Sequence, residues 1–242
     1  MSPFQKQIAV VTGSSGGIGG AIAAALVAGG AHVNAVGRDS AKLESLVARL
    51  RGPVGEVEAV LADLTKDEDV ALLHDRVTRR FGRLDILVHS AGAIAHGKLE
   101  ESPIETMDAL YAANVRGPCL LTKGLLPLLK SPRGQIVFIN SSAGLSSRPN
   151  AGIYSATQHA VKALADGLRN EVNADNVRVL SIYPGRTATP LIAALTATEG
   201  STYRPEMLLQ PSDIASVVSN ALALPWTAEV TDINIRSMQK SY

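Results

Sequence analysis

Short apolar runs alternate with amphipathic segments along the whole chain, and this alternation constrains the fold more than any other feature. The apolar runs are 8–11, 32–36, 57–61, 84–89, 135–140, 177–183 and 230–235, and the segments with helical periodicity are 17–29, 40–50, 67–80, 104–130, 153–173 and 211–223. Near-continuous apolar runs suit strands that are buried on both faces, and their alternation with helices indicates βαβ units. The sequence therefore predicts an α/β fold, with a doubly wound parallel sheet of about seven strands and helices on both faces.

The chain is predicted to form one domain over residues 1–242, because no linker or repeat divides it and this length suits one large core. Two segments fall outside the alternation, 91–102 and 186–210. Both follow the carboxyl ends of predicted strands, where open α/β sheets bind ligands. The second is long for a plain connection, so we expect it to form a loop that serves as a substrate lid.

Composition argues against several classes of function. The 23 basic and 22 acidic residues nearly cancel, so no electrostatic footprint for nucleic acid or a membrane surface is expected. Residues 8–37 lack charge, but a polar, glycine-rich turn interrupts them after four apolar residues, which excludes a spanning helix or a signal peptide. We therefore expect a soluble cytoplasmic protein.

The single cysteine, Cys119, excludes an internal disulfide and a cysteine-rich zinc site. We expect this side chain to be buried, and we predict no metal site.

A glycine-rich turn lies between the first predicted strand and the first predicted helix. Residues 12–19 read Thr-Gly-Ser-Ser-Gly-Gly-Ile-Gly. Gly13 allows a tight turn, while Gly17 and Gly19 let the backbone approach a phosphate and let the helix pack close to the strand. The amides at the start of the helix, at the positive end of its dipole, then bind a pyrophosphate. Because a strand and a helix flank these glycines, the motif predicts a dinucleotide site in a Rossmann-type fold rather than a plain turn.

The end of the second predicted strand indicates which dinucleotide binds. An NAD site usually places a carboxylate there to hold the ribose 2′-hydroxyl. Here Gly37 follows Val36, and the next residue is Arg38, whose guanidinium can pair with a 2′-phosphate. Asp39 is the competing signal for NAD, although it also suits the cap of the next helix. The sequence therefore favours NADP.

Taken together, these motifs resemble those of the short-chain dehydrogenase/reductase family over nearly the whole chain. The motif Thr12-Gly13-x-x-x-Gly17-Ile18-Gly19 matches the family's TGxxxGxG, Asp63-Leu64 matches its adenine-contacting aspartate, and His89-Ser90-Ala91-Gly92 stands where the family has Asn-Asn-Ala-Gly. The resemblance implies a cofactor site made of Gly13, Ser15, Gly17, Ile18, Gly19, Arg38, Asp63, Leu64, Ala91, Gly92, Tyr154, Gln158, Pro184, Gly185, Thr187 and Thr189. His89 itself is interpreted as a packing residue at a strand end.

The same resemblance implies the catalytic residues. Tyr154 matches the catalytic tyrosine, and Asn114 matches the helix asparagine that supports a proton-relay water. The substrate-orienting serine is Ser141 or Ser142, and Ser141 is preferred because it stands 13 residues before the tyrosine. The segment Tyr183–Thr189 resembles the one that holds the nicotinamide carboxamide.

The chain departs from the family at one catalytic position. The family motif is Tyr-x-x-x-Lys, and here Gln158 stands four residues after Tyr154, on the same helix face. Its amide can still hydrogen-bond the nicotinamide ribose, but it carries no charge to lower the pKa of the phenol. A shift of about three pKa units corresponds to roughly 4 kcal/mol, so the loss should weaken catalysis and spare the fold. Lys162 is a possible but distant substitute, and His159 is expected to pack elsewhere.

Two functions follow from these residues. The first is an NADP(H)-dependent oxidoreductase that interconverts a carbonyl and an alcohol by hydride transfer, with Tyr154, Ser141, Asn114 and Gln158 as its catalytic set. The alternative is a catalytically weak or inactive NADP(H)-binding protein with a regulatory role, which Gln158 favours. The substrate is a small carbonyl compound or alcohol; residues 228–233 loosely resemble the branch with 3-hydroxy acid and serine dehydrogenases. The family resemblance also implies a homodimer or homotetramer formed through the helices at 104–130 and 153–173.

Overall fold

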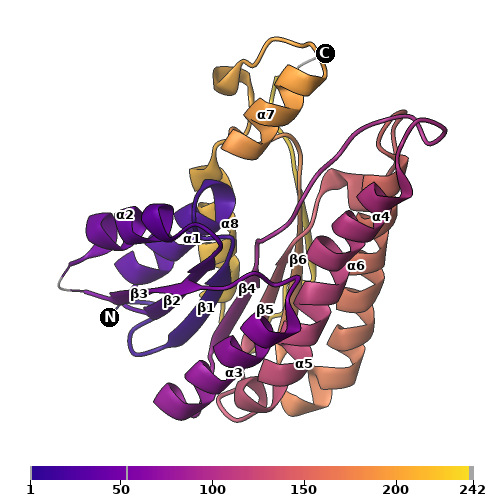
Figure 1. The fold of residues 1–242 in the computed structure, drawn as a ribbon. Coiled ribbons are helices and arrows are strands. Elements are labelled where there is room, and N and C mark those ends of the chain that lie inside the picture. The colour runs from indigo at the N-terminus through magenta and orange to yellow at the C-terminus, as the bar shows by residue number, and fades with distance from the viewer. Residues whose placement is uncertain (1, 53, 240–242) are drawn as a thin grey trace.

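A single seven-stranded sheet forms the centre of the computed structural model, which describes residues 2–52 and 54–239 (Figure 1). Its strands are β1 (Ile8–Thr12), β2 (His32–Gly37), β3 (Glu56–Leu61), β4 (Ile86–His89), β5 (Gln135–Ile139), β6 (Arg178–Pro184) and β7 (Asp232–Ile235). They lie in the order β3-β2-β1-β4-β5-β6-β7, and all neighbouring pairs are parallel. The predicted doubly wound parallel sheet is confirmed.

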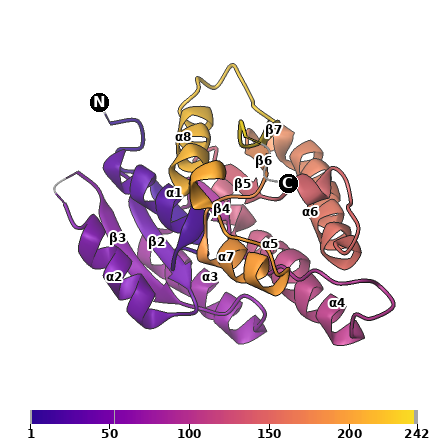
Figure 2. The ribbon, with the colours of Figure 1, turned by 90° about the horizontal axis from the view of Figure 1, so that it is seen from above.

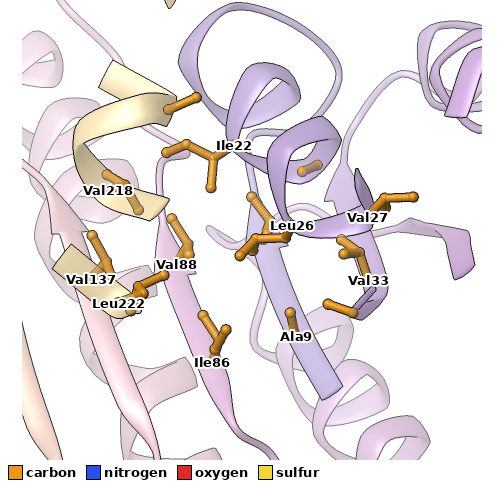
Figure 3. Packing of buried hydrophobic residues seen from close by; sticks show 14 of the residues in the cluster. Ala9, Ile22, Leu26, Val27, Val33, Ile86, Val88, Val137, Val218 and Leu222 are labelled. Carbon is orange, nitrogen blue, oxygen red and sulfur yellow. The ribbon is translucent and has the colours of Figure 1, made fainter. Parts of the chain in front are cut away.

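Helices cover both faces of this sheet (Figures 1 and 2). On one face lie α1 (Gly17–Ala28), α2 (Ser40–Leu50) and α8 (Pro211–Leu222), and on the other lie α3 (Asp67–Phe81), α5 (Gly117–Lys130) and α6 (Gly152–Val172). Figure 3 shows the first layer, where Ile22 and Leu26 of α1 and Val218 of α8 lie above the β1, β4 and β5 side chains. All three side chains are fully buried, so the apolar stripe of each helix and the sheet face form one core.

The order of the strands creates a switch point between β1 and β4. The chain moves outward from β1 through β2 to β3, then returns and continues from β4 in the opposite direction. Ligands bind at such a point, beyond the carboxyl ends of the strands. Thr12 fixes the junction there, because its hydroxyl accepts hydrogen bonds from the amides of Ser90 (3.0 Å) and Ala91 (3.1 Å).

The segment predicted as one helix over 104–130 is more complex than expected. It consists of α4 (Ile104–Tyr111), a π-helical turn over Ala112–Arg116, and α5. Asn114 lies in the wider π-helical turn, and such turns occur frequently at functional sites. Hydrophobic periodicity does not reveal one extra residue in a turn, so this feature could not be predicted from the pattern of apolar residues.

Two further expectations were wrong in detail. The 186–210 segment is not a plain loop, because it contains α7 (Pro190–Thr198), which lies above the carboxyl edge of the sheet in Figure 1. Thr189 caps α7 by accepting a hydrogen bond from the Ile192 amide, and Pro190 occupies its first turn. Cys119 is exposed on α5 rather than buried, because the inward-facing side of that helix is formed by residues such as Leu121 and Leu125. None of the helices in the described ranges is both long and apolar enough to cross a bilayer.

We expect Gly19→Ala to lower the free energy of unfolding by about 1–3 kcal/mol. A Cβ atom at this position would lie 2.5 Å from the carbonyl oxygen of Gly13, so α1 would have to move away from β1. Gly167→Ala is the matched control, because a Cβ there meets no atom within 4 Å on an exposed face of α6. That change should raise stability by about 0.5–1 kcal/mol. Urea unfolding measures both, and equal effects would contradict the tight packing of α1.

Candidate active site

One cavity of about 950 Å³ lies at the carboxyl ends of the strands. Every residue that the sequence analysis assigned to the cofactor or catalytic site lines it. The lining extends from the glycine turn after β1 and the end of β2 to the start of α6 and to α7. Residues that are far apart in the chain therefore face one space, large enough for a small molecule beside a cofactor.

The glycine turn closes one wall of the cavity. Gly13 has a φ of 71°, and a Cβ atom on it would lie 2.7 Å from the carbonyl oxygen of Ser90. Gly17 has a φ of 57° and packs against Thr189, whose methyl group would be 3.1 Å from an added Cβ. The hydroxyl of Ser15 is buried and has no hydrogen-bond partner among the described residues. An exposed backbone cradle with an unsatisfied hydroxyl fits a phosphate-bearing dinucleotide, which would supply the missing acceptor.

The end of β2 carries one free cation. Arg38 is exposed, lines the cavity and forms no ion pair with another described residue. The Asp39 carboxylate instead caps α2 by accepting from the Lys42 amide (3.0 Å) and pairs with the Lys42 ammonium (3.0 Å). Gly37 carries no side chain, and a Cβ atom there would lie 2.0 Å from the Ser15 hydroxyl oxygen, which would have to rotate away. The position at which an NAD site holds its ribose therefore has no carboxylate in this chain.

The loops after β3 and β4 complete the dinucleotide side of the cavity. Burial opposes ionisation of Asp63, but hydrogen bonds from the amide and hydroxyl of Thr65 outweigh it and hold the Asp63 pKa below its usual value. Asn114 secures the next loop: its Oδ1 accepts from the Ala93 amide (2.7 Å), and its Nδ2 donates to the Ala93 carbonyl (2.9 Å) and to the hydroxyl of Thr157 (3.1 Å). The π-helical turn thus ties the loop after β4 to α6.

Tyr154 and Ser141 face the cavity from α6 and from the end of β5. Burial raises the pKa of the Tyr154 phenol above 10.0, and the neighbouring Ser141 hydroxyl offsets part of this shift. Asn140 positions both segments, since its side chain accepts from the Ser141 amide (2.6 Å) and donates to the Gln158 carbonyl (3.1 Å). Asn140 was not among the site residues predicted from the sequence, although it adjoins the serine.

Gln158 is buried, lines the cavity, and makes no side-chain hydrogen bond to any other described residue. Lys162 does not replace the missing lysine, because its ammonium pairs with Asp166 at 2.5 Å and does not line the cavity. His159 turns away and contacts the Ser155 carbonyl at 2.8 Å, as expected. No cation from these two positions therefore reaches the Gln158 side of the phenol.

The structure supports the interpretation of His89 as a packing residue. Its ring stacks on Phe138 at 4.8 Å between centroids, and its Nε2 lies 2.7 Å from the Thr122 hydroxyl. Burial lowers the pKa of His89 to about 3, so the ring stays neutral.

Three polar side chains at the substrate end form a cluster that the sequence did not predict. Glu199, at the end of α7, contacts both Arg186 and His96. Glu199 occupies the guanidinium of Arg186, so this arginine is not free to pair with a substrate carboxylate. Arg204, the other arginine in residues 186–210, is exposed and does not line the cavity. His96 and Glu199 are 103 residues apart, and no local motif links them.

Comparison with known proteins matches this arrangement to one family. The model of the short chain dehydrogenase family matches residues 7–200. An uncharacterized oxidoreductase of Staphylococcus saprophyticus is 34% identical over 239 residues, which is 98% of this chain and 99% of the relative.

Two solved structures share the fold over nearly the full length. An alcohol dehydrogenase of Thermococcus sibiricus, complexed with 5-hydroxy-NADP, superposes with a TM-score of 0.89 at 29% identity, covering 98% of this chain and 100% of the other. A 3-ketoacyl-(acyl-carrier-protein) reductase of Brucella melitensis, complexed with NADH, gives 0.85 at 28% identity, covering 96% and 98%. With its parallel sheet, glycine turn and the cavity at the carboxyl ends of the strands, the chain belongs to the short chain dehydrogenase family of oxidoreductases.

Proposed function

We propose that the protein is an NADP(H)-dependent oxidoreductase that interconverts a small carbonyl compound and its alcohol. The observation that carries this proposal is the single cavity, which joins the glycine turn and Arg38 to Tyr154 and Ser141. A dinucleotide site that continues into a phenol and a hydroxyl suits hydride transfer coupled to proton transfer. Residues 186–210, with α7, act as the substrate lid of a single domain, and the protein works in the cytoplasm.

Arg38 and Gly37 support NADP over NAD. Arg38 is free to pair with a 2′-phosphate, Asp39 is engaged by Lys42, and Gly37 carries no carboxylate. The Thermococcus sibiricus enzyme was solved with an NADP derivative and the Brucella melitensis enzyme with NADH, so the family fold alone does not decide the cofactor. The assignment of NADP as the cofactor therefore rests on the side chains at the end of β2.

Each catalytic side chain has a distinct role in reduction. When bound, NADP(H) supplies the hydride. Ser141 orients the substrate oxygen, and Tyr154 donates a proton from its phenol, which burial keeps protonated. Asn114 holds the loop after β4 and supports a water through its remaining acceptor capacity. Gln158 hydrogen-bonds the nicotinamide ribose with its unpartnered amide.

One observation favours the alternative, a catalytically weak or inactive NADP(H)-binding protein with a regulatory role. Neither Gln158 nor Lys162 offers a free positive charge to the phenol, and burial raises the Tyr154 pKa. Oxidation of an alcohol needs the phenolate, so it should suffer more than reduction. The two functions therefore differ in turnover and not in cofactor binding.

The family also forms oligomers through its long helices, and we infer a homodimer or homotetramer here. Ile104, Met107 and Tyr111 expose apolar side chains on α4, and Leu164 does so on α6. These are two of the segments expected to meet a second copy.

A joint measurement of NADPH binding and carbonyl-dependent NADPH oxidation tests the function. We expect binding together with turnover of at least one compound in an aldehyde and ketone panel. Tyr154→Phe should then reduce turnover about 10²–10⁴-fold, because the proton donor is lost. The Kd for NADPH should rise by no more than about tenfold, which corresponds to the loss of one hydrogen bond to the cofactor. Binding without any turnover would instead establish the regulatory alternative.

Arg38→Gln should weaken NADPH binding about 10–100-fold, because a charge-assisted pair with the 2′-phosphate is worth roughly 1.5–3 kcal/mol. NADH lacks this phosphate, so its Kd is the internal control and should not change. Fluorescence titration measures both constants. A parallel loss for both cofactors would contradict the role of Arg38.

Gln158→Lys should raise alcohol oxidation about tenfold or more, because the added charge lowers the pKa of Tyr154. In the native protein the oxidation rate should keep rising above pH 10, since burial raises that pKa and the phenolate forms late. In the Lys variant the rise should occur at lower pH. Gln158→Leu is the neutral control and should not shift the profile. An unchanged profile in the Lys variant would overturn this explanation of the missing charge.

A further inference from the structure

A carboxylate from the lid connects two segments that border the substrate end of the cavity. Glu199 Oε1 lies 2.8 Å from Nδ1 of His96, in the loop after β4. The same carboxylate accepts from Nη2 of Arg186, in the loop after β6, at 2.8 and 2.6 Å. All three side chains line the cavity, and His96 and Glu199 are only 22% and 23% exposed. The imidazole is therefore held in place by the lid.

The contact with Glu199 fixes which ring nitrogen of His96 carries hydrogen. Burial opposes ionisation of Glu199, but hydrogen bonds from Arg186 and His96 outweigh it and lower the Glu199 pKa, so the group is a carboxylate. A carboxylate only accepts hydrogen bonds, so Nδ1 must be the donor. In the neutral ring Nε2 is then an acceptor. Nε2 has no hydrogen-bond partner among the described residues and is not sealed from solvent.

His96 stands beside the proposed proton donor. Its ring centroid is 6.2 Å from that of Tyr154, and the two planes are inclined by 54°. Both rings line the same cavity, so one small molecule can contact the phenol and the imidazole together. Ile94 and Leu195 are apolar side chains that also line the cavity, and neither can form a hydrogen bond with a substrate.

The charges around His96 favour a neutral hydroxyl over an anionic group. Arg186 and Glu199 compensate each other in an ion pair, which leaves no net charge beside the imidazole. Arg148 also lines the cavity, but it is exposed to solvent. An acceptor nitrogen in this setting matches the hydrogen of an alcohol and offers nothing to a carboxylate.

We propose that His96 is a specificity-determining residue that accepts a hydrogen bond from a hydroxyl on the carbon next to the substrate carbonyl, and that Glu199 is the residue that positions it. The preferred substrates are then small α-hydroxy carbonyl compounds. This inference rests on the proposed oxidoreductase function and names the substrate class of the same site. A site built to bond a hydroxyl discriminates strongly against an analogue that lacks it.

Three ketones that share an acetyl group test the proposal with NADPH as reductant. Hydroxyacetone carries the hydroxyl, butanone replaces it with a methyl group, and pyruvate replaces the hydroxymethyl group with a carboxylate. We expect kcat/KM for hydroxyacetone to exceed that for butanone by about tenfold or more. His96→Leu should abolish this preference, mainly by lowering kcat/KM for hydroxyacetone. His96→Gln, whose amide oxygen can reach the position of Nε2, should restore part of the preference. His74→Leu, which removes a half-buried histidine next to Asp75 on α3, outside the cavity, is the matched control and should leave the ratio unchanged.

The possible outcomes separate the inference from the proposed function. Equal kcat/KM values for hydroxyacetone and butanone in the native protein would overturn the role of His96 while leaving the oxidoreductase function intact. The role of His96 would also be overturned if the native protein preferred pyruvate and His96→Leu removed that preference. Such a result would indicate that the site recognises charge. Turnover of none of the three by the native protein would count against the proposed function, and the decision on His96 then passes to a measurement that needs no turnover.

Nitrogen-15 NMR of the histidine rings in the NADPH-saturated protein supplies that measurement. His96 should show the tautomer with hydrogen on Nδ1, and Glu199→Gln should reduce its population. Hydroxyacetone should shift the Nε2 resonance of His96, and butanone at the same concentration should not. Hydrogen on Nε2 of the neutral ring, or equal responses to both ketones, would contradict the proposal whether or not the protein turns over a ketone.

Discussion

The close approach of the glycine turn to the loop after β4 is the constraint on which the rest of the structure depends. Backbone atoms at Gly13 and Ser90 lie so near each other that no side chain fits between them. Thr12 bonds the same loop, which fixes β1 beside β4 at the point where the sheet changes direction. Because the cavity lies above this junction, the same contacts position the dinucleotide wall and the start of the loop that carries His96.

Most of the fold could be predicted because burial imposes a period on the sequence. Each strand matches an apolar run to within two residues at either end, and both helical layers follow from amphipathic segments. The secondary-structure predictions were wrong where the spacing of apolar residues does not distinguish one structure from another. The π-helical turn at Asn114 adds one residue without changing the pattern, and α7 is nearly uniformly small and apolar, so it lacks a polar face that would mark it as a helix.

The candidate site could be predicted in part, because its motifs are local in sequence. The glycine turn, Arg38, Ser141 and Tyr154 stand at fixed positions relative to predicted strands and helices, and they face one cavity. The contact of His96 with Glu199 could not be predicted, since it depends on how the lid folds back over the sheet. The ion pair between Lys162 and Asp166 was not predicted either, because the choice of partner for a lysine depends on how the side chains pack in the folded protein.

The contact between Gly37 and Ser15 limits how the protein could change during evolution. An acidic residue at position 37 would require its Cβ to occupy space that the Ser15 hydroxyl fills. The Ser15 hydroxyl would then have to rotate away from the position in which it lines the cavity. The effect of a new residue at position 37 therefore depends on which residue stands at position 15. A carboxylate at the end of β2 would thus alter the packing of the glycine turn as well as the local charge.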